Sequence, residues 1–227
     1  RLIPADTALT RMGIISILFL KRRRLLTQTF AANPEFLHLK GPGGRTLYGC
    51  DQDWFQSFWQ RKAGCGPCTL ANIMRYLAQA GALVGAAAPE APGCLPLMEE
   101  MWGYVTPGMM GLNSTARFAQ GAARALKKAG SGLTPRALDI EKGASLQDAS
   151  QLISFIESGL QQAPVAFLNL LRRQLGPLEA WHWVTVVGLS HTEKGAVLHI
   201  YDNGLAFDLP LEQWLNAEGS GGFVAFF

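Results

Sequence analysis

The chain has 227 residues, the length of one domain of ordinary size or of two half-domains that share a cleft. Its 48% hydrophobic residues suffice for a sizeable core, and its 16% charged residues are too few for a disordered chain. The net charge of +3 consists of +5 over residues 1–40 and −2 over the rest, which argues against a nucleic-acid-binding body. Four cysteines are too few for a disulfide-dense scaffold, and no apolar run is long enough for a membrane-spanning helix.

The first predicted element is a short apolar run, Met12–Leu20, which is followed at once by four basic residues, 21–24. A secretory signal has the opposite order, with its charges before the apolar run and a small-residue cleavage site after it. We therefore expect no signal peptide, which favours a cytoplasmic location. We predict that residues 1–44 are a basic and apolar leader that packs on the domain. A membrane-surface or regulatory segment is the alternative.

The remaining elements change from helical to strand-rich along the chain. Apolar residues three and four positions apart predict a helix over 65–80, which Gly81 ends. The other predicted elements are a strand at 45–48, helices at 95–104, 114–128 and 145–159, and strands at 165–170, 181–189, 196–201, 205–209 and 222–227. This order predicts an α+β fold in which one domain, 45–227, comprises a helical lobe (45–160) and a β lobe (161–227).

The helix over 65–80 opens with Cys65-Gly66-Pro67-Cys68, the strongest chemical signal in the sequence. A cysteine at a helix N-terminus lies at the positive end of the helix dipole, which favours its thiolate. One chemistry that uses such a thiolate is thiol–disulfide exchange, because Cys-Gly-Pro-Cys resembles the redox motif of thioredoxin. The surroundings fit this interpretation poorly, since a polar and aromatic segment, 52–64, precedes the motif in place of a buried strand.

The other chemistry is nucleophilic catalysis, which needs a base for the thiol and a group that orients that base. Of the four histidines, His182 stands out because it begins an apolar predicted strand and is flanked by two tryptophans. Asp202 ends the next predicted strand, and a tight turn at 190–195 would make the two strands antiparallel neighbours. The carboxylate of Asp202 can then approach the His182 ring. We expect a packing role for His38, a solvated position for His191 and a structural role for His199.

The order of these residues resembles that of papain-like cysteine peptidases and is most similar to the branch of bacteriocin-leader-processing peptidases. The residues that carry the resemblance are Gln52, Cys65-Gly66-Pro67, the strand that begins at His182, and Tyr201-Asp202. The resemblance implies a two-lobed papain-like fold with an active-site cleft between the helical and β lobes. It also implies a cysteine peptidase that acts on a peptide or protein substrate. Its nucleophile would be Cys65, its base His182, the orienting residue Asp202, and an oxyanion-hole donor Gln52.

Two assignments within this resemblance have alternatives. Cys68 stands where papain itself has its nucleophile, whereas the Gly-Pro after Cys65 matches the bacteriocin-processing branch. We favour Cys65 and expect Cys68 to be a buried helix residue. Gln56 and Gln60 also precede the cysteines, and Gln60 lies nearer to the spacing in papain, but we favour Gln52. A thioredoxin-like oxidoreductase and a non-catalytic module with a papain-like fold are the alternatives from other functional classes.

The other candidate residues carry no predicted chemistry. Cys50 and Cys94 lack the paired spacing of a zinc site, so we expect neither a metal ion nor another cofactor. We expect Asp51 and Asp53 to form hydrogen bonds within a turn. The aromatic residues that follow have helical spacing and are predicted to pack in the core; they are Trp54, Phe55, Phe58 and Trp59. We expect no nucleic-acid partner.

Overall fold

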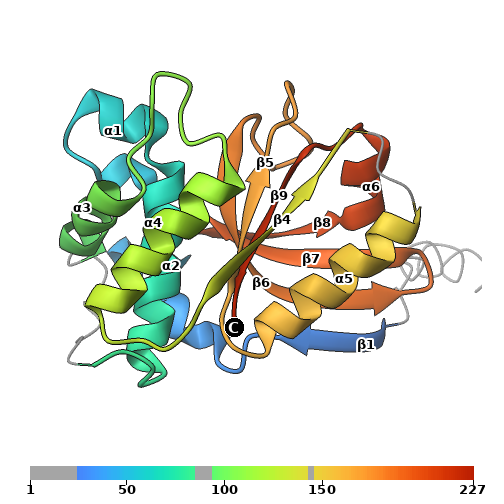
Figure 1. Cartoon of the computed structure of the whole chain (residues 1–227), viewed down its shortest axis with the longest axis horizontal. Coiled ribbons are helices and arrows are strands. Elements are labelled where there is room, and N and C mark those ends of the chain that lie inside the picture. The colour runs from blue at the N-terminus through green and yellow to red at the C-terminus, as the bar shows by residue number, and fades with distance from the viewer. Residues whose placement is uncertain (1–24, 85–93, 143–145) are drawn as a thin grey trace, which may run out of the picture.

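A computed structural model of the chain describes residues 25–84, 94–142 and 146–227 (Figure 1). Its main sheet is antiparallel, with strands in the order β4-β9-β5-β6-β7-β8 and with β1 paired to β6. These strands are β1 (Leu25–Phe30), β4 (Pro135–Ile140), β5 (Val165–Asn169), β6 (His182–Thr192), β7 (Gly195–Asp202), β8 (Leu205–Pro210) and β9 (Gly221–Phe226). A separate small sheet pairs β2 (His38–Lys40) with β3 (Thr46–Tyr48).

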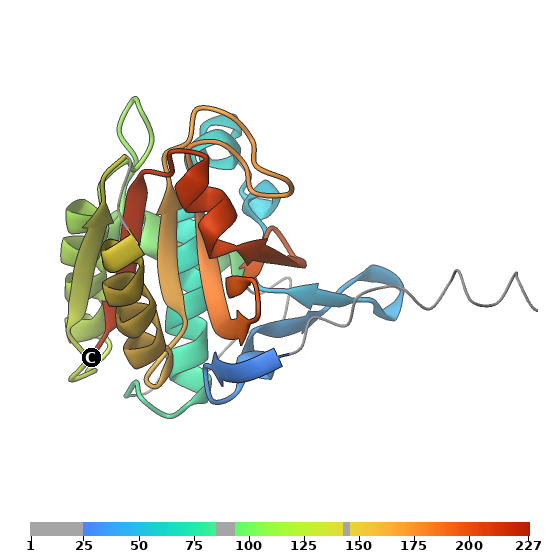
Figure 2. The same cartoon turned by 90° about the vertical axis from the view of Figure 1, so that its right-hand side faces the viewer.

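The α-helices of the described residues form two groups along the main sheet. They are α1 (Phe58–Ala63), α2 (Cys65–Gln79), α3 (Cys94–Tyr104), α4 (Thr115–Lys128), α5 (Leu146–Leu160) and α6 (Leu211–Asn216). Helices α1 to α4 lie at one end of the sheet, and the view in Figure 2 shows the β2–β3 hairpin projecting away from α4 and α5. Helix α2 joins the helical and the sheet parts, because it packs against α3 and α4 as well as β5 and β6.

The sequence of α2 explains this central place. Leu70, Ile73 and Leu77 recur at helical spacing and are buried. Every residue from Gly66 to Leu77 is buried, so neighbouring elements cover the helix on all sides. Gly81, with a φ of 72°, follows the helix in the left-handed conformation that glycine adopts readily. The start of α2 is therefore held in a rigid frame.

The central strands of the main sheet are covered on both faces. β5 and β9 are buried along their whole length, and β6 is buried except at His191. These strands are mostly apolar and lack the regular alternation of apolar and polar residues that a strand with one solvated face shows. Phe167 of β5 stacks on Phe223 of β9 with ring centroids 4.4 Å apart, and Trp214 of α6 meets Phe167 edge-on. This packing holds β5 in place beside β6, the strand that begins at His182.

The mixture of helices and antiparallel strands agrees with the predicted α+β class. The predicted helix over 65–80 and the five predicted C-terminal strands lie within a few residues of α2 and of β5 to β9. Strands β1, β2 and β4 and helices α1 and α6 were not predicted. The division into two lobes stays a prediction, and the apolar run Met12–Leu20 lies outside the described residues. Among the described helices, none is long and apolar enough to cross a membrane.

One expectation about the core is wrong. Phe58 and Trp59, predicted to pack in the core, are 70% and 46% exposed, whereas Phe55 is buried. The reason is that α1 is short: it has six residues, and Ala63 is the one that is buried. The outer face of α1 therefore presents its aromatic rings to solvent.

Candidate active site

Cys65 is the first residue of α2 and follows α1 directly across Gly64. A Cβ at Gly64 would lie 2.5 Å from the Phe55 ring, and a Cβ at Gly66 would lie 2.8 Å from the Leu112 side chain. Glycine is thus needed on both sides of the cysteine because the neighbouring segments approach so closely. Cys65 itself is partly exposed. It lies at the end of the 15-residue helix where the helix dipole attracts negative charge.

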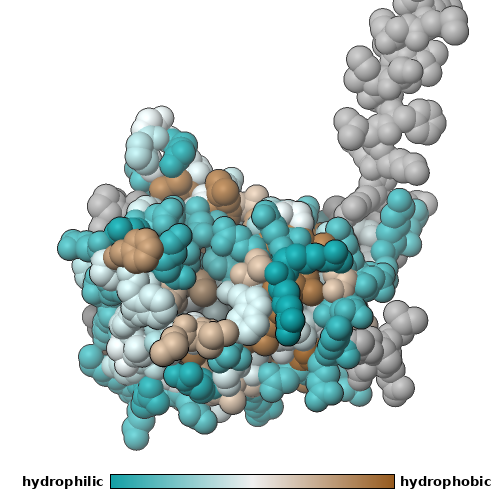
Figure 3. All heavy atoms as spheres, turned by 90° about the horizontal axis from the view of Figure 1, so that it is seen from above, coloured by the Kyte–Doolittle hydropathy of each residue, from teal (hydrophilic) through white to brown (hydrophobic). Residues whose placement is uncertain are grey.

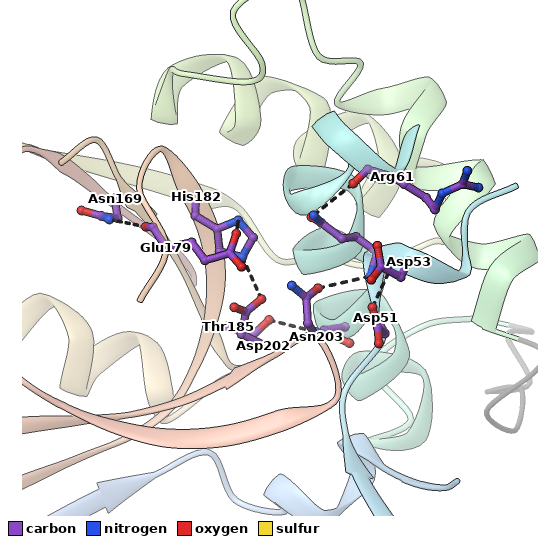
Figure 4. A network of polar contacts seen from close by, with 11 residues as sticks. Asp51, Asp53, Arg61, Asn169, Glu179, His182, Thr185, Asp202 and Asn203 are labelled. Atoms are coloured by element: carbon purple, nitrogen blue, oxygen red, sulfur yellow. Dashed lines mark hydrogen bonds and ion pairs between the residues drawn. The ribbon is translucent and has the colours of Figure 1, made fainter. Parts of the chain in front are cut away.

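His182 is the first residue of β6 and is 3% exposed. Its Nε2 lies 2.9 Å from Oδ1 of Asp202, the last residue of the adjacent antiparallel strand β7 (Figure 4). Because a carboxylate only accepts hydrogen bonds, Nε2 carries the proton of this bond. The other ring nitrogen, Nδ1, is then available to Cys65.

Three influences set the charge of the imidazole. Burial opposes the charged form and lowers the pKa of His182, whereas hydrogen bonds with Asp202 and with the Cys65 thiol raise it. The hydrogen bonds and the charge interactions with Asp202 and Cys65 together outweigh burial, so the pKa of His182 lies well above its ordinary value of 6.5. The imidazole is therefore a strong acceptor for the proton of the neighbouring thiol, as a nucleophilic cysteine requires.

Gln52 begins a short 3-10 helix, Gln52–Trp54, beside the turn that follows β7. Its backbone N–H donates to Oδ1 of Asn203 over 3.2 Å, and its Nε2 donates to the Arg61 carbonyl over 3.1 Å (Figure 4). Since Asn203 directly follows Asp202, the backbone bond attaches Gln52 to the same turn as the carboxylate that contacts His182. The Oε1 of Gln52 is buried and has no hydrogen-bond partner within the described part of the chain.

Gln60, the alternative to Gln52, forms its hydrogen bonds with Ser57 and Glu99. Its backbone N–H donates to Oγ of Ser57 at the start of α1, and its side-chain Oε1 accepts from the same hydroxyl over 2.8 Å. Its Nε2 donates to Glu99 over 3.3 Å. Gln56, the third candidate, is exposed. Among the three glutamines, Gln52 is thus the one that the structure attaches to the turn after β7.

Asn72, a buried residue of α2, connects the three segments that carry the site. Its Oδ1 accepts from the backbone N–H of Cys50 over 2.7 Å, and its Nδ2 donates to Oγ1 of Thr185 in β6 over 3.0 Å. Gly49 passes so close that a Cβ there would lie 2.8 Å from Nδ2 of Asn72, and its φ of 83° favours glycine. Asn72 was not singled out from the sequence, although an asparagine within the apolar run of a helix indicates a buried polar contact.

The other three cysteines lie in the core. Cys50, Cys68 and Cys94 are buried, and all four cysteines are free thiols. Contact with Cys50 lowers the pKa of Cys68, but burial and the nearby charges of Asp202, Asp51 and Cys65 together raise this pKa above its ordinary value of 9.0. Cys68 is therefore a buried helix residue, as predicted, while Cys65 contacts His182.

The other three histidines are each held by a polar partner. His38 lies 2.8 Å from the Tyr201 hydroxyl, and His191, which was expected to be solvated, lies 2.8 Å from Glu157. His199 contacts Ser190 through Nε2 and Asp208 through Nδ1, the latter over 2.7 Å. These are the residue types of a serine-hydrolase triad, but Ser190 is buried within the sheet, so a substrate cannot reach its hydroxyl. The structural role expected for His199 is confirmed.

The edge of the molecule at which α2 and β6 begin carries exposed apolar side chains. They include Phe58 of α1, Met109 and Met110 of the turn before α4, and Trp181, which precedes His182. Figure 3 looks onto this edge and shows hydrophobic patches among hydrophilic side chains. Asp51 and Asp53 also lie near the site, where Oδ1 of Asp51 accepts from the Asp53 N–H over 2.9 Å, as the turn prediction requires. No group of three or more possible metal ligands occurs among the described residues.

Comparison with solved structures finds a similar arrangement of helices and strands in UfSP from C. elegans. The TM-score is 0.46, the sequence identity is 9%, and the match covers 92% of this chain. It covers 35% of the other chain, so the present chain spans about a third of the length of that protein. No protein-family model matches the chain, and no curated protein matches it in sequence. The function is therefore inferred from the site itself.

Proposed function

We propose that the chain is a papain-like cysteine peptidase, a thiol hydrolase that cleaves peptide or amide bonds with Cys65, His182 and Asp202. The observation that carries the proposal is the buried His182 ring, which is bonded to Asp202 at 2.9 Å and also contacts the Cys65 thiol. A thiol, a base and a carboxylate that orients the base have the roles that acyl transfer requires.

The first half-reaction forms a thioester. His182 takes the thiol proton, and the Cys65 sulfur attacks the carbonyl carbon of the substrate to give a tetrahedral intermediate. The backbone N–H of Cys65 and Nε2 of Gln52 donate to the oxyanion, and one such donor typically contributes about 3 kcal/mol. The C–N bond then breaks as His182 gives its proton to the leaving amine. Asp202 stabilises the imidazolium that exists between these two proton transfers.

The second half-reaction restores the enzyme. His182 takes a proton from a water molecule, and the resulting hydroxide attacks the carbonyl carbon of the thioester. The C–S bond breaks, the carboxylic acid product leaves, and the sulfur takes back its proton from His182. Each proton transfer has a residue of the site as its donor or acceptor.

Two finer statements belong to the same proposal. Within the papain-like class, the chain stands nearest to the branch of bacteriocin-leader-processing peptidases, because Gly66-Pro67 follows the nucleophile. Residues 45–160 form the helical lobe and residues 161–227 form the β lobe. The substrate then binds in a cleft between the start of α2 and the start of β6.

Selective alkylation tests the proposal. We expect iodoacetamide near neutral pH to modify Cys65 faster than Cys50, Cys68 and Cys94, as measured by peptide mass spectrometry. Burial alone also protects these three thiols, so the decisive variant is His182→Ala, which leaves Cys65 exposed but removes its base. Loss of at least tenfold in the Cys65 rate with an unchanged far-UV spectrum supports the proposal. An unchanged rate contradicts it.

Cys68→Ser separates hydrolysis from thiol–disulfide exchange. A hydrolase keeps its activity in this variant, because Cys68 lies in the core and takes no part in the reaction. A thioredoxin-like oxidoreductase would lose its ability to reduce insulin, because a second thiol is needed to release the mixed disulfide. The structure offers no support for the redox alternative, since helix α1, and not a strand, precedes Cys65.

A further inference from the structure

Glu179 places a second carboxylate beside His182. Its Oε2 lies 4.0 Å from Nδ1 of His182, the ring nitrogen on the Cys65 side, whereas Asp202 holds Nε2 (Figure 4). The Glu179 side chain is 57% exposed. In the proposed reaction, Nδ1 delivers the proton to the leaving amine, so Glu179 lies next to the part of the substrate that follows the cleaved bond.

The backbone at Glu179 is fixed from inside the protein. Nδ2 of the buried Asn169 donates to the Glu179 carbonyl over 2.6 Å. Oδ1 of Asn169 accepts from Trp214 over 2.9 Å and from the backbone of Leu171 over 3.2 Å. Leu178, which precedes Glu179, is fully buried. The fold therefore fixes the backbone from which the Glu179 side chain extends toward His182.

Trp181 adds an aromatic surface at the same place. This residue lies between Glu179 and His182 in the chain, and its side chain is 43% exposed. Its φ of 54° is rare for a bulky residue, and such strained conformations cluster at functional sites. A carboxylate and an exposed indole are the two groups that proteins use to bind an ammonium or guanidinium group.

The charged groups around the site strengthen this preference for a cation. Glu179, Asp202, Asp51 and Asp53 are all acidic. Arg61, the arginine of the same polar network, donates to the backbone carbonyls of residues 55 and 56 and not to these acids. Within the described residues, Glu179 forms no ion pair with a lysine or arginine. Its ion-pair partner is the His182 ring at 4.0 Å, and because 57% of its side chain is exposed, the carboxylate also faces solvent, where it can meet a substrate cation.

We propose that Glu179 is a specificity-determining residue that selects substrates with lysine or arginine directly after the cleaved bond. The inference rests on the proposed peptidase function and names its substrate class. An ion pair at a half-exposed position changes binding by up to about fivefold. We therefore expect about a fivefold preference for basic over acidic residues at that position.

A peptide library measures this preference without requiring the natural substrate. Denatured proteome is digested with a protease that cuts at aromatic residues, so that lysine and arginine remain inside the peptides, and is then incubated with the full chain. Mass spectrometry gives the residue after each new cut. We expect basic residues to be enriched about fivefold over acidic ones, Glu179→Gln to abolish most of this enrichment, and Glu179→Lys to favour acidic residues.

Glu193→Gln is the matched control, because Glu193 is an exposed glutamate in the turn at the far end of β6. We expect this variant to keep the wild-type enrichment. Reversal by Glu179→Lys is the decisive result, since a merely structural role cannot exchange one preferred charge for the other. If the wild type cuts peptides with no preference for basic residues, or if Glu179→Lys leaves the preference unchanged, the inference is wrong.

The alkylation of Cys65 in the same preparations separates the two proposals. If Cys65 reacts selectively and peptides are cut without a charge preference, the specificity proposal fails and the peptidase function stands. If Cys65 shows no His182-dependent reactivity and no peptide is cut, the proposed function fails, and the specificity proposal fails with it.

Discussion

Replacement of Asn72 by alanine should destabilise the protein and disturb the site at the same time. The amide of Asn72 joins the backbone of Cys50, which leads into Gln52, to Thr185 of β6. Alanine removes both hydrogen bonds and leaves the buried N–H of Cys50 without its partner. A net intramolecular hydrogen bond contributes about 1 kcal/mol, and a buried donor left unsatisfied costs about 1–3 kcal/mol. We expect a loss of about 3 kcal/mol in the free energy of unfolding.

Urea unfolding followed by far-UV circular dichroism measures this loss, provided that the slope with denaturant stays unchanged. Thr185→Val is the matched variant, because valine has the shape of threonine and lacks the hydroxyl that accepts from Asn72. We expect Thr185→Val to cost about 1–2 kcal/mol, since it leaves one N–H of Asn72 without a partner. The double variant should lose about 1 kcal/mol less unfolding free energy than the sum of the two single losses, because both substitutions remove the same hydrogen bond.

The reasoning fails if Asn72→Ala costs less than about 1 kcal/mol, the value of one net hydrogen bond. It also fails if the two substitutions are strictly additive, because the Asn72–Thr185 bond would then contribute nothing. Activity supplies a second test. Since the Cys50 segment leads into Gln52, Asn72→Ala should slow peptide cleavage more than it slows the alkylation of Cys65.

Three further predictions concern the site directly. Asp202→Asn keeps the shape of the side chain but removes its charge, and should lower kcat by about 10⁴-fold for the library peptide cut fastest, as loss of the orienting carboxylate does in serine peptidases. Gln52→Ala should lower kcat by about 10²–10³-fold and leave alkylation of Cys65 unchanged, because iodoacetamide forms no oxyanion. The raised pKa of His182 gives a stability contribution that is complete below about pH 6.5 and is lost as pH rises through the folded-state value. The stability advantage of the wild type over His182→Gln, measured by urea unfolding at pH 5, 7 and 9, should therefore shrink as pH rises.

The parts of the site that could be predicted from the sequence are those that local rules determine. Apolar residues at helical spacing indicated α2 and placed Cys65 at its start. A short turn between two apolar strands indicated the antiparallel pairing that brings Asp202 to His182, because strands joined by a tight turn pair with each other. In both cases the residues that matter are close in sequence or joined by one hairpin.

The parts that could not be predicted depend on contacts between distant segments. Strand β4 pairs with β9 at the far end of the chain, and β1 pairs with β6, and no local pattern encodes either partner. The choice of Gln52 over Gln60 depends on Asn203, which lies 151 residues beyond Gln52. Glu179 carries no motif, and its place beside His182 follows from hydrogen bonds of Asn169 inside the sheet.

The same four residues, Cys65-Gly66-Pro67-Cys68, can serve hydrolysis or disulfide exchange, and the local sequence cannot decide between them. Both chemistries use a thiol at the positive end of a helix. They differ in the neighbour that each thiol meets. Here Cys68 points to Cys50 in the core, whereas Cys65 meets an imidazole that is held by a carboxylate. The base beside Cys65 serves acyl transfer. Because Cys68 is buried against Cys50, the arrangement of the two thiols on α2 favours hydrolysis over disulfide exchange.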